Sequence, residues 1–210
     1  MFVTDKIKFL IEYFTKNMPE PETELAYKDE YQLVVAVVLS AQCTDKRVNI
    51  ITPPFFEKFP NFESLASASF EEVYQLIKSC TYPNNKSKNL IKLAQTVCNE
   101  YDGILPQTRD ELEKLPGIGR KTANVVASVA FKEARFAVDT HVFRVANRLG
   151  IVNAKNPLET EKQLIKLFPE AVIPDAHHWL LLHGRYCCTA RNPKCETCGI
   201  SQICKSFEKK

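Results

Sequence analysis

The residues best suited to chemistry lie in the stretch Leu115-Pro116-Gly117-Ile118-Gly119-Arg120-Lys121-Thr122, followed about one helix later by Asp139-Thr140-His141. Two glycines separated by one residue allow a tight turn with exposed N–H groups, because neither carries a Cβ atom. Residues 120–131 have the apolar spacing of a helix, which would place Lys121 at the positive end of the helix dipole. An amine held there loses its proton more readily, and a neutral amine is a nucleophile toward carbonyl-like carbon.

The turn before this helix also offers backbone amides to an anion, and a phosphate is the natural candidate. A Walker-type nucleotide loop requires glycine directly before Lys-Ser/Thr, whereas Arg120 intervenes here. The remaining alternative is a plain helix–helix turn followed by a solvated Arg-Lys pair.

A second group of residues, the cysteines, is concentrated near the end of the chain. Five of the eight fall within residues 187–204, and four of these are separated by six, two and five residues: Cys188, Cys195, Cys198 and Cys204. Four thiolates so close in sequence can converge on one cofactor. Tetrathiolate zinc sites usually contain two CxxC pairs and this chain has one, so the spacing favours an iron–sulfur cluster and leaves structural zinc as the alternative. Cys187 is interpreted as a non-ligand.

Composition places the chain among globular proteins of one large or two small domains. It has 210 residues, 45% of them hydrophobic, and a formal net charge of +3. Charged residues interrupt the apolar ones in residues 1–19, and the run 33–39 is too short to span a bilayer, so we expect neither a signal peptide nor a membrane helix. The expected location is the cytoplasm, with nucleoid association if the protein binds DNA. Disulfides are therefore not expected, and three isolated cysteines are interpreted as small buried apolar residues: Cys43, Cys80 and Cys98.

The elements that must position these residues are all helical, because helical punctuation recurs and strand-like alternation is almost absent. A buried central helix is predicted over 31–42, a restart at Thr44 or Asp45, and an interruption at Pro53-Pro54. Ser69 to Glu72 and Thr108 to Glu111 have the pattern of capping boxes. The other predicted helices are 4–17, 84–100, 120–131, one from Asp139 to Gly150, 157–168 and 175–185.

Several polar residues have more than one interpretation. Arg191 and Lys194 lie between the first two cluster cysteines, where a rigid cofactor would hold them outward as phosphate contacts; a solvated loop is the alternative. The four histidines have no HExxH or other metal-ligand spacing, so we interpret them as structural: His141, His177, His178 and His183.

Taken together, these motifs resemble the endonuclease III family, the helix-hairpin-helix DNA glycosylases with AP lyase activity of base-excision repair. The resemblance rests on the run Leu115 to Val126, on Val138-Asp-Thr-His141 and on the Cys-x6-Cys-x2-Cys-x5-Cys array. It extends to Leu39-Ser-Ala-Gln-Cys-Thr-Asp45 and His183-Gly-Arg-Tyr186, and so covers almost the whole chain.

By resemblance, Lys121 is the nucleophile that attacks C1′ of the damaged nucleotide, expels the base and forms a Schiff base. β-Elimination then cuts the strand 3′ to the lesion. Asp139 matches the catalytic aspartate, and it is also a good helix N-cap; the two roles are compatible because capping can leave one oxygen free. Gln42 corresponds to the residue that fills the space of the extruded base. Tyr82 stands where the family often has an aliphatic wedge, so it is expected either to stack on bases or to pack on the core.

The resemblance also implies an architecture of two helical lobes that flank a DNA-binding cleft. One lobe, residues 22–132, would carry the hairpin and Lys121. The other, residues 1–21 plus 133–210, would carry Asp139 and a [4Fe–4S] cluster on the four cysteines. The implied substrate is duplex DNA with oxidised pyrimidines or abasic sites, bound by a monomer with no membrane partner.

Three alternatives to this function stay open. An adenine-mismatch glycosylase shares the fold but lacks the matching lysine and carries a further C-terminal domain. A relative for alkylated bases or pyrimidine dimers differs in loops whose specificity we do not interpret. A non-catalytic DNA-binding module with a structural metal would not need the pair of Lys121 and Asp139.

Overall fold

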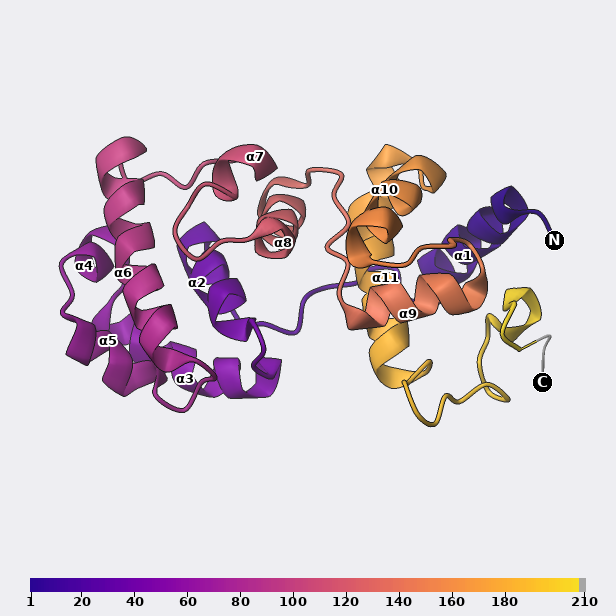
Figure 1. Ribbon diagram of the computed structural model, residues 1–210, viewed down its shortest axis with the longest axis horizontal. Coiled ribbons are helices and arrows are strands. Elements are labelled where there is room, and N and C mark those ends of the chain that lie inside the picture. Colours follow the sequence, from indigo (N-terminus) through magenta and orange to yellow (C-terminus); the bar gives the residue numbers. More distant parts are fainter. Residues whose placement is uncertain (208–210) are drawn as a thin grey trace. The chain divides into compact units, whose positions relative to one another are not determined.

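The computed structural model describes residues 1–207, and every regular element in this range is a helix, which confirms the all-α prediction. None of these helices has the length and apolar character needed to cross a bilayer. Figure 1 labels the α-helices: α1 (Val3–Asn17), α2 (Glu30–Ser40), α3 (Asp45–Lys58), α4 (Phe62–Ala66), α5 (Phe70–Ile77), α6 (Pro83–Glu100), α7 (Arg109–Leu112), α8 (Arg120–Phe131), α9 (Thr140–Leu149), α10 (Pro157–Leu167) and α11 (Ile173–Tyr186). Two short 3₁₀ turns complete the set: η1 (Glu170–Val172) and η2 (Ser201–Ile203).

The chain divides into two compact units. One is continuous, from Thr23 to Glu133, and contains α2 to α8. The other joins Met1–Glu22 to the chain from Ala134 onward, and contains α1 and α9 to α11. Each unit has an apolar core of its own. The predicted nucleophile therefore belongs to the first unit, and the predicted aspartate and cysteine cluster belong to the second.

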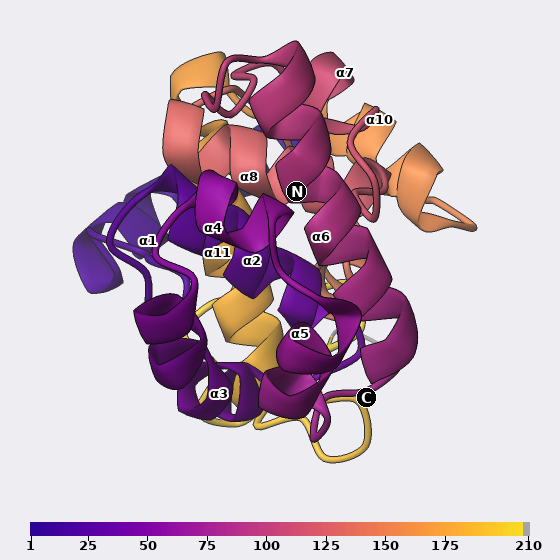
Figure 2. The ribbon, with the colours of Figure 1, turned by 90° about the vertical axis from the view of Figure 1, so that its left-hand side faces the viewer.

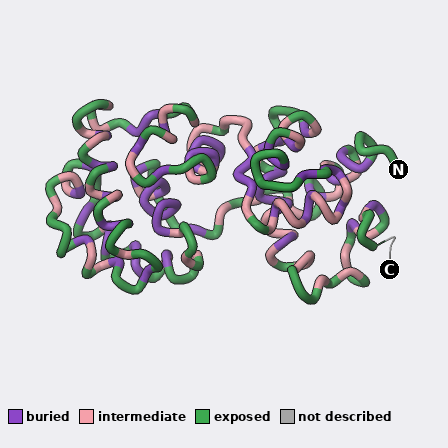
Figure 3. The backbone as a smooth tube through the Cα atoms, viewed as in Figure 1, coloured by how far each residue is buried: buried purple, intermediate pink, exposed green. Residues whose placement is uncertain are grey.

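Helix α2 is the centre of the 23–133 unit. Every side chain from Leu33 to Leu39 is buried, as predicted from its uniformly apolar sequence (Figure 3). α2 contacts α3, α6 and α8, and Figure 2 shows α6 running beside α4 and α5 in the same unit. The helix ends at Ser40, earlier than predicted, because Ala41 leaves the helical conformation with ψ 111° and Gln42 follows in a left-handed conformation with φ 55°.

The predicted interruption at Pro53-Pro54 is wrong, since α3 continues through both prolines. Each proline removes a backbone donor from the helix interior. Both prolines are exposed, and on the other face Val48, Ile51 and Phe55 are buried in the core. These buried side chains come both before and after the two prolines in sequence. Their burial stabilises the helix enough to compensate for the lost hydrogen bonds.

Helix starts were predicted well where the capping partner is local. Ser69 and Glu72 form the reciprocal capping box at α5, as predicted. Thr108 caps α7 by accepting from the N–H of Glu111, but the Glu111 carboxylate accepts from the Thr108 hydroxyl and not from its N–H. Only half of that predicted box is therefore present.

Four other helix starts differ from the prediction. α2 begins one residue early, at Glu30, and α11 begins two residues early, at Ile173. α1 begins at Val3, before Thr4, and its N-cap is Phe2, which makes no side-chain capping bond. α6 begins at Pro83, because proline fits the first position of a helix, and this leaves Asn84 inside the first turn.

In the second unit, α9 packs on α11. Gly150, with φ 71°, ends α9 as predicted. Gly184 permits a close approach of the two helices, because a Cβ atom at this position would lie 2.8 Å from the Cβ of His141. Phe14 of α1 stacks on Trp179 of α11, with ring centroids 5.6 Å apart. The start of α9, and therefore Asp139, is held by a well-packed core.

Candidate functional site

The two-glycine turn joins α7 to α8. Its apolar residues point into the core, and its glycines face the surface. Leu115 and Ile118 are buried in the core, whereas Gly117 and Gly119 are exposed. Only Gly117 has a positive φ, +80°, and a Cβ atom there would lie 2.7 Å from the Cβ of Asn89. Gly119 is the N-cap of α8, with φ −91°, and nothing lies within 4 Å of its Cβ position. The backbone requires glycine at 117, while Gly119 leaves open space in front of the turn.

Lys121 lies in the first turn of α8, and its side chain is exposed. Within residues 1–207 its ammonium group makes no hydrogen bond or ion pair. The preceding Arg120 is exposed, Thr122 is half-buried and Pro116 is half-buried. The helix is fastened to the core by side chains on its other face: Ala123, Val126 and Ala127. Lys121 is therefore open to a substrate.

Asp139 is the N-cap of α9, as its sequence context predicted. Its Oδ1 atom accepts two hydrogen bonds, from the N–H of His141 at 2.9 Å and from that of Val142 at 2.8 Å. Both bonds end on Oδ1, so capping does not use Oδ2. The carboxylate is fixed in direction and keeps one oxygen for another partner.

Gln42 and Tyr82 lie in two turns that are bonded to each other in the 23–133 unit. Both residues have positive φ, 55° and 53°, which is uncommon without glycine. The hydroxyl of Thr81 donates to the carbonyl oxygen of Gln42 at 2.7 Å. Tyr82 is 62% exposed, so the alternative in which this ring packs on the core is wrong.

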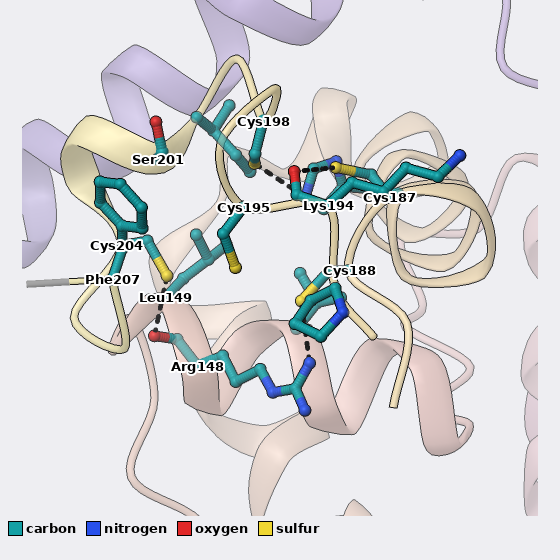
Figure 4. Close-up of a pocket in the computed structure, with 14 residues that line it drawn as sticks. Arg148, Leu149, Cys187, Cys188, Lys194, Cys195, Cys198, Ser201, Cys204 and Phe207 are labelled. Atoms are coloured by element: carbon teal, nitrogen blue, oxygen red, sulfur yellow. Dashed lines mark hydrogen bonds between the residues drawn. The ribbon is translucent and has the colours of Figure 1, made fainter. Parts of the chain in front are cut away.

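The four predicted cluster cysteines line one pocket in the second unit (Figure 4). Leu149 and Ile200 contribute apolar walls to this pocket. None of the eight cysteines forms a disulfide. Four sulfur donors around one space are a chemically suitable set for an iron–sulfur cluster, which takes thiolate ligands.

A second set of donors shares this pocket. The ligand atoms of His183, Cys187 and Cys198 lie within 4.8 Å of one another, and Cys198 Sγ is 3.7 Å from His183 Nε2. Burial lowers the pKa of His183 to about 4, so its ring is neutral near pH 7. Burial raises the pKa of Cys198 to about 12, so this thiol must release a proton when it binds a metal. No metal-ligand spacing in the sequence pointed to His183, which lines the pocket from α11.

Two arginines of α9 attach the cysteine loop to the helix that carries Asp139. Arg144 donates to the carbonyl oxygens of Cys188, at 3.0 Å, and of Gly184, at 2.8 Å. Arg148 donates to the carbonyl oxygens of Thr189, at 2.7 Å, and of Ala190, at 2.9 Å. Helix α9 therefore connects the aspartate and the cysteine loop through direct contacts.

Comparisons with known proteins agree with this geometry. Residues 35–170 match the HhH-GPD superfamily of base excision DNA repair proteins, and residues 188–204 match the iron–sulfur binding domain of endonuclease III. The chain is 44% identical over 198 residues to endonuclease III of Rickettsia felis, which covers 94% of this chain and 93% of the relative. It is 44% identical over 206 residues to endonuclease III of Bacillus subtilis, covering 98% and 94%. The chain belongs to the endonuclease III family.

A solved structure of a trapped endonuclease III–DNA covalent intermediate has the same fold, with a TM-score of 0.93 and 41% identity, and covers 100% of this chain and 99% of that one. As a member of the endonuclease III family, the chain is a base-excision repair DNA glycosylase with AP lyase activity, and its substrate is DNA. This confirms the predicted enzyme class. The predicted [4Fe–4S] cofactor is also confirmed, and structural zinc is set aside.

The other residues predicted to contact DNA differ in their exposure to solvent. Arg191 and Lys194 are exposed on the cysteine loop, whereas His141 is half-buried, with its Nδ1 atom 3.1 Å from an Arg144 nitrogen. Of the cysteines interpreted as buried, Cys80 is buried, but Cys43 and Cys98 are partly exposed.

The contacts made by Arg144 and Arg148 were not identified from the sequence. The two arginines are four residues apart on one helix, and that spacing was a usable signal that both face the same way. Their partners were not predictable, because the accepting carbonyl groups lie about forty residues away in sequence.

Proposed function

We propose that Lys121 is the nucleophile of this endonuclease III family member. Its amine attacks C1′ of the damaged nucleotide, the base leaves, and the resulting Schiff base undergoes β-elimination, which cuts the strand 3′ to the lesion. The observation that carries the proposal is the open position of Lys121 in the first turn of α8, with no partner among residues 1–207. An amine buried in an ion pair within the fold would not reach C1′.

Asp139 is proposed to act with Lys121 on the same nucleotide. Its carboxylate either assists deprotonation of the amine or stabilises the oxocarbenium-like charge that develops at C1′. The capping bonds to Oδ1 support this role, because they fix the carboxylate without occupying Oδ2.

Three groups of residues are proposed to bind the DNA. The hairpin residues Leu115 to Gly119 contribute the backbone N–H groups of Gly117 and Gly119, which make no hydrogen bond among residues 1–207 and can donate to a phosphate. Basic and polar side chains near the helix starts and on the cysteine loop contact phosphates: Arg120, Thr122, His141, Arg191 and Lys194. Gln42 fills the space of the extruded base, and Tyr82 stacks on neighbouring bases, offsetting the unstacking cost of a few kcal/mol.

The [4Fe–4S] cluster is proposed to bind through Cys188, Cys195, Cys198 and Cys204. The family match begins at Cys188 and ends at Cys204, which supports this set over one that includes Cys187. When bound, the cluster organises the loop and takes no part in glycosylase or lyase chemistry. The loop's own residues, among them Arg191 and Lys194, are then presented to the DNA.

The proposed substrates are oxidised pyrimidines in duplex DNA. A panel of duplexes that each contain one lesion tests this: thymine glycol, an alkylated purine, a pyrimidine dimer and a mismatched adenine. We expect strand cleavage at thymine glycol, with a β-elimination product at the 3′ side of the lesion. Cleavage at another lesion with none at thymine glycol would assign the chain to a different specificity. We also infer that the enzyme acts as a monomer on nucleoid DNA in the cytoplasm.

A further inference from the structure

Lys86 of α6 is a buried lysine whose ammonium group contacts backbone carbonyl groups. Its side chain is 7% exposed. Nζ donates to the carbonyl oxygens of Leu39 and Ala41, each at 2.8 Å, and lies 4.0 Å from Cys80 Sγ. Burying a charge is costly unless the charge is hydrogen-bonded. The last carbonyl groups of a helix lack intrahelical partners and form the negative end of its dipole, so the end of α2 is a suitable partner for this cation.

These bonds join the two turns that carry the proposed DNA contacts. Ala41 directly precedes Gln42, and Lys86 lies one turn into the helix that Tyr82 caps. The Thr81 hydroxyl bonds to the Gln42 carbonyl oxygen at 2.7 Å. Beneath them, the Sγ atoms of Cys80 and Cys43 lie 3.3 Å apart. Contacts made by buried or partly buried side chains therefore hold both turns in place beneath their exposed residues.

The two turns hold a backbone conformation that the chain would not adopt unaided. Gln42 and Tyr82 both have positive φ although neither is glycine. Such residues cost free energy and persist only where the surrounding structure determines them, and they cluster at functional sites. The hydrogen bonds from Lys86 help to hold this conformation, because one of them fixes the carbonyl group immediately before Gln42.

We propose that Lys86 is a positioning residue for DNA: by bonding the end of α2 to α6, its ammonium group sets the backbone of Gln42 and Tyr82 so that both side chains enter the duplex together. The proposal rests on the proposed function of Gln42 and Tyr82. Lys86 itself does not touch the substrate. The competing explanation is that Lys86 only stabilises the fold. Substitution of a second buried lysine, which is not bonded to these turns, distinguishes the two explanations.

Lys6 is that matched control. It is 6% exposed, and its Nζ donates to the carbonyl oxygen of Leu149, at the end of α9, at 2.7 Å. Like Lys86, Lys6 is a buried lysine bonded to the end of a helix, but it donates to one carbonyl oxygen instead of two and belongs to the other unit. Lys86→Met and Lys6→Met each replace a buried ammonium group by an apolar side chain of similar length and remove its hydrogen bonds to the carbonyl groups at a helix end.

The test compares these variants as cluster-containing full-length enzymes. The dissociation constant is measured for a duplex that contains a tetrahydrofuran abasic analogue, and 2-aminopurine fluorescence beside the lesion reports base unstacking. We expect Lys86→Met to bind about tenfold more weakly and to lose the fluorescence change. Lys6→Met should bind within about threefold of wild type, although both variants melt at a lower temperature. If Lys86→Met does not fold, Lys86→Gln takes its place.

A double-mutant cycle tests whether Lys86 acts through Tyr82. If it does, Lys86→Met should weaken binding much less in a Tyr82→Ala background than in wild type, whereas Lys6→Met should have the same effect in both backgrounds. Equal binding losses in Lys86→Met and Lys6→Met, or additive effects of Lys86→Met and Tyr82→Ala, would overturn the proposal.

A further measurement separates this proposal from the proposed function. Cleavage of a single-stranded abasic oligonucleotide requires Lys121 but no insertion into a duplex, so Lys86→Met should cleave it within about twofold of wild type. Failure of wild-type enzyme to give a borohydride-trapped adduct on a thymine-glycol duplex would refute the role of Lys121 and leave the binding comparison valid. Loss of single-strand cleavage in Lys86→Met alone would contradict the positioning role.

Discussion

At the scale of single residues, Lys121 and Asp139 have contrasting surroundings. Lys121 is exposed and makes no contact with a partner group among residues 1–207, whereas Asp139 is held by two backbone N–H groups. A nucleophile has to move toward C1′ as the bond forms, while a charge-stabilising carboxylate works best when it is already in place. The two environments suit the two proposed roles.

Replacing Asp139 separates its capping role from its chemical role. Asparagine caps helices as well as aspartate does, so Asp139→Asn should melt at the wild-type temperature. Its rate of thymine-glycol excision should fall about 10²-fold or more, because the carboxylate charge is lost. Asp139→Ala should in addition lose about 1 kcal/mol of the free energy of unfolding. Single-turnover excision and thermal denaturation measure both effects, and a wild-type rate for Asp139→Asn would rule out a catalytic carboxylate.

Substitution of single cysteines identifies the cluster ligands. Cys187 and Cys195 both line the pocket, and only Cys195 belongs to the proposed ligand set. Purified Cys187→Ser should keep the visible absorption and the iron content of wild type, whereas Cys195→Ser should lose most of both. The opposite pattern would show that Cys187 is a ligand and that Cys195 is not.

At the scale of the elements, the hairpin between α7 and α8 combines a constrained position with an open one. Gly117 is constrained by its positive φ and by Asn89, while Gly119 faces empty space. Binding to a phosphate requires open space in front of the N–H groups, and folding requires the constrained turn that presents them. The two glycines can therefore be tested independently.

Gly117→Ala should destabilise the protein by about 1–3 kcal/mol, because alanine is strained at positive φ and its Cβ atom would clash with Asn89. Gly119→Ser should leave the free energy of unfolding nearly unchanged, since serine is a good N-cap residue. It should nevertheless weaken duplex binding, because the new side chain fills the space in front of the turn. Chemical denaturation and fluorescence anisotropy provide the two readouts. Wild-type binding by Gly119→Ser would exclude the hairpin as a phosphate contact.

The elements also show which features could be predicted from sequence. Capping by Ser69 and Asp139 and the stop at Gly150 were predicted because the partner groups lie within a few residues. The continuation of α3 through Pro53-Pro54 was not predicted, because it depends on core contacts made by the opposite face of that helix. A prediction from local sequence is wrong where burial in the folded core outweighs the local preference.

The candidate site follows the same rule. The spacing of the cysteines favoured an iron–sulfur cluster over zinc, the family resemblance implied [4Fe–4S], and the glycine-rich turn placed Lys121 at the start of a helix. The bonds from Lys86 to Leu39 and Ala41 join residues 47 and 45 positions apart, and His183 reaches Cys198 from another element. Such contacts require the folded chain.

At the scale of the whole molecule, the two units have separate cores, and the cluster loop belongs to only one of them. Within that unit the loop is fastened to α9 by Arg144 and Arg148. Loss of the cluster should therefore disturb α9 and the loop before it disturbs the hairpin.

Removal of the cluster by chelation under mild oxidation should accelerate amide hydrogen exchange in residues 187–204 and in α9. Hydrogen exchange within residues 23–133 should stay close to that of the untreated protein, because the core of this unit is formed by residues outside the cysteine loop. Hydrogen-exchange mass spectrometry distinguishes the units directly. An equal loss of protection in both units would contradict the separation of the cores.

The most direct measurement of the central claim is borohydride trapping on a duplex that contains thymine glycol. Reduction of a Schiff base would join wild-type enzyme to the DNA, and peptide mapping should place the link at Lys121. Lys121→Ala should bind the same duplex and give no adduct. Absence of an adduct from active wild-type enzyme, or a wild-type yield of adduct from Lys121→Ala, would contradict the assignment of Lys121 as the nucleophile.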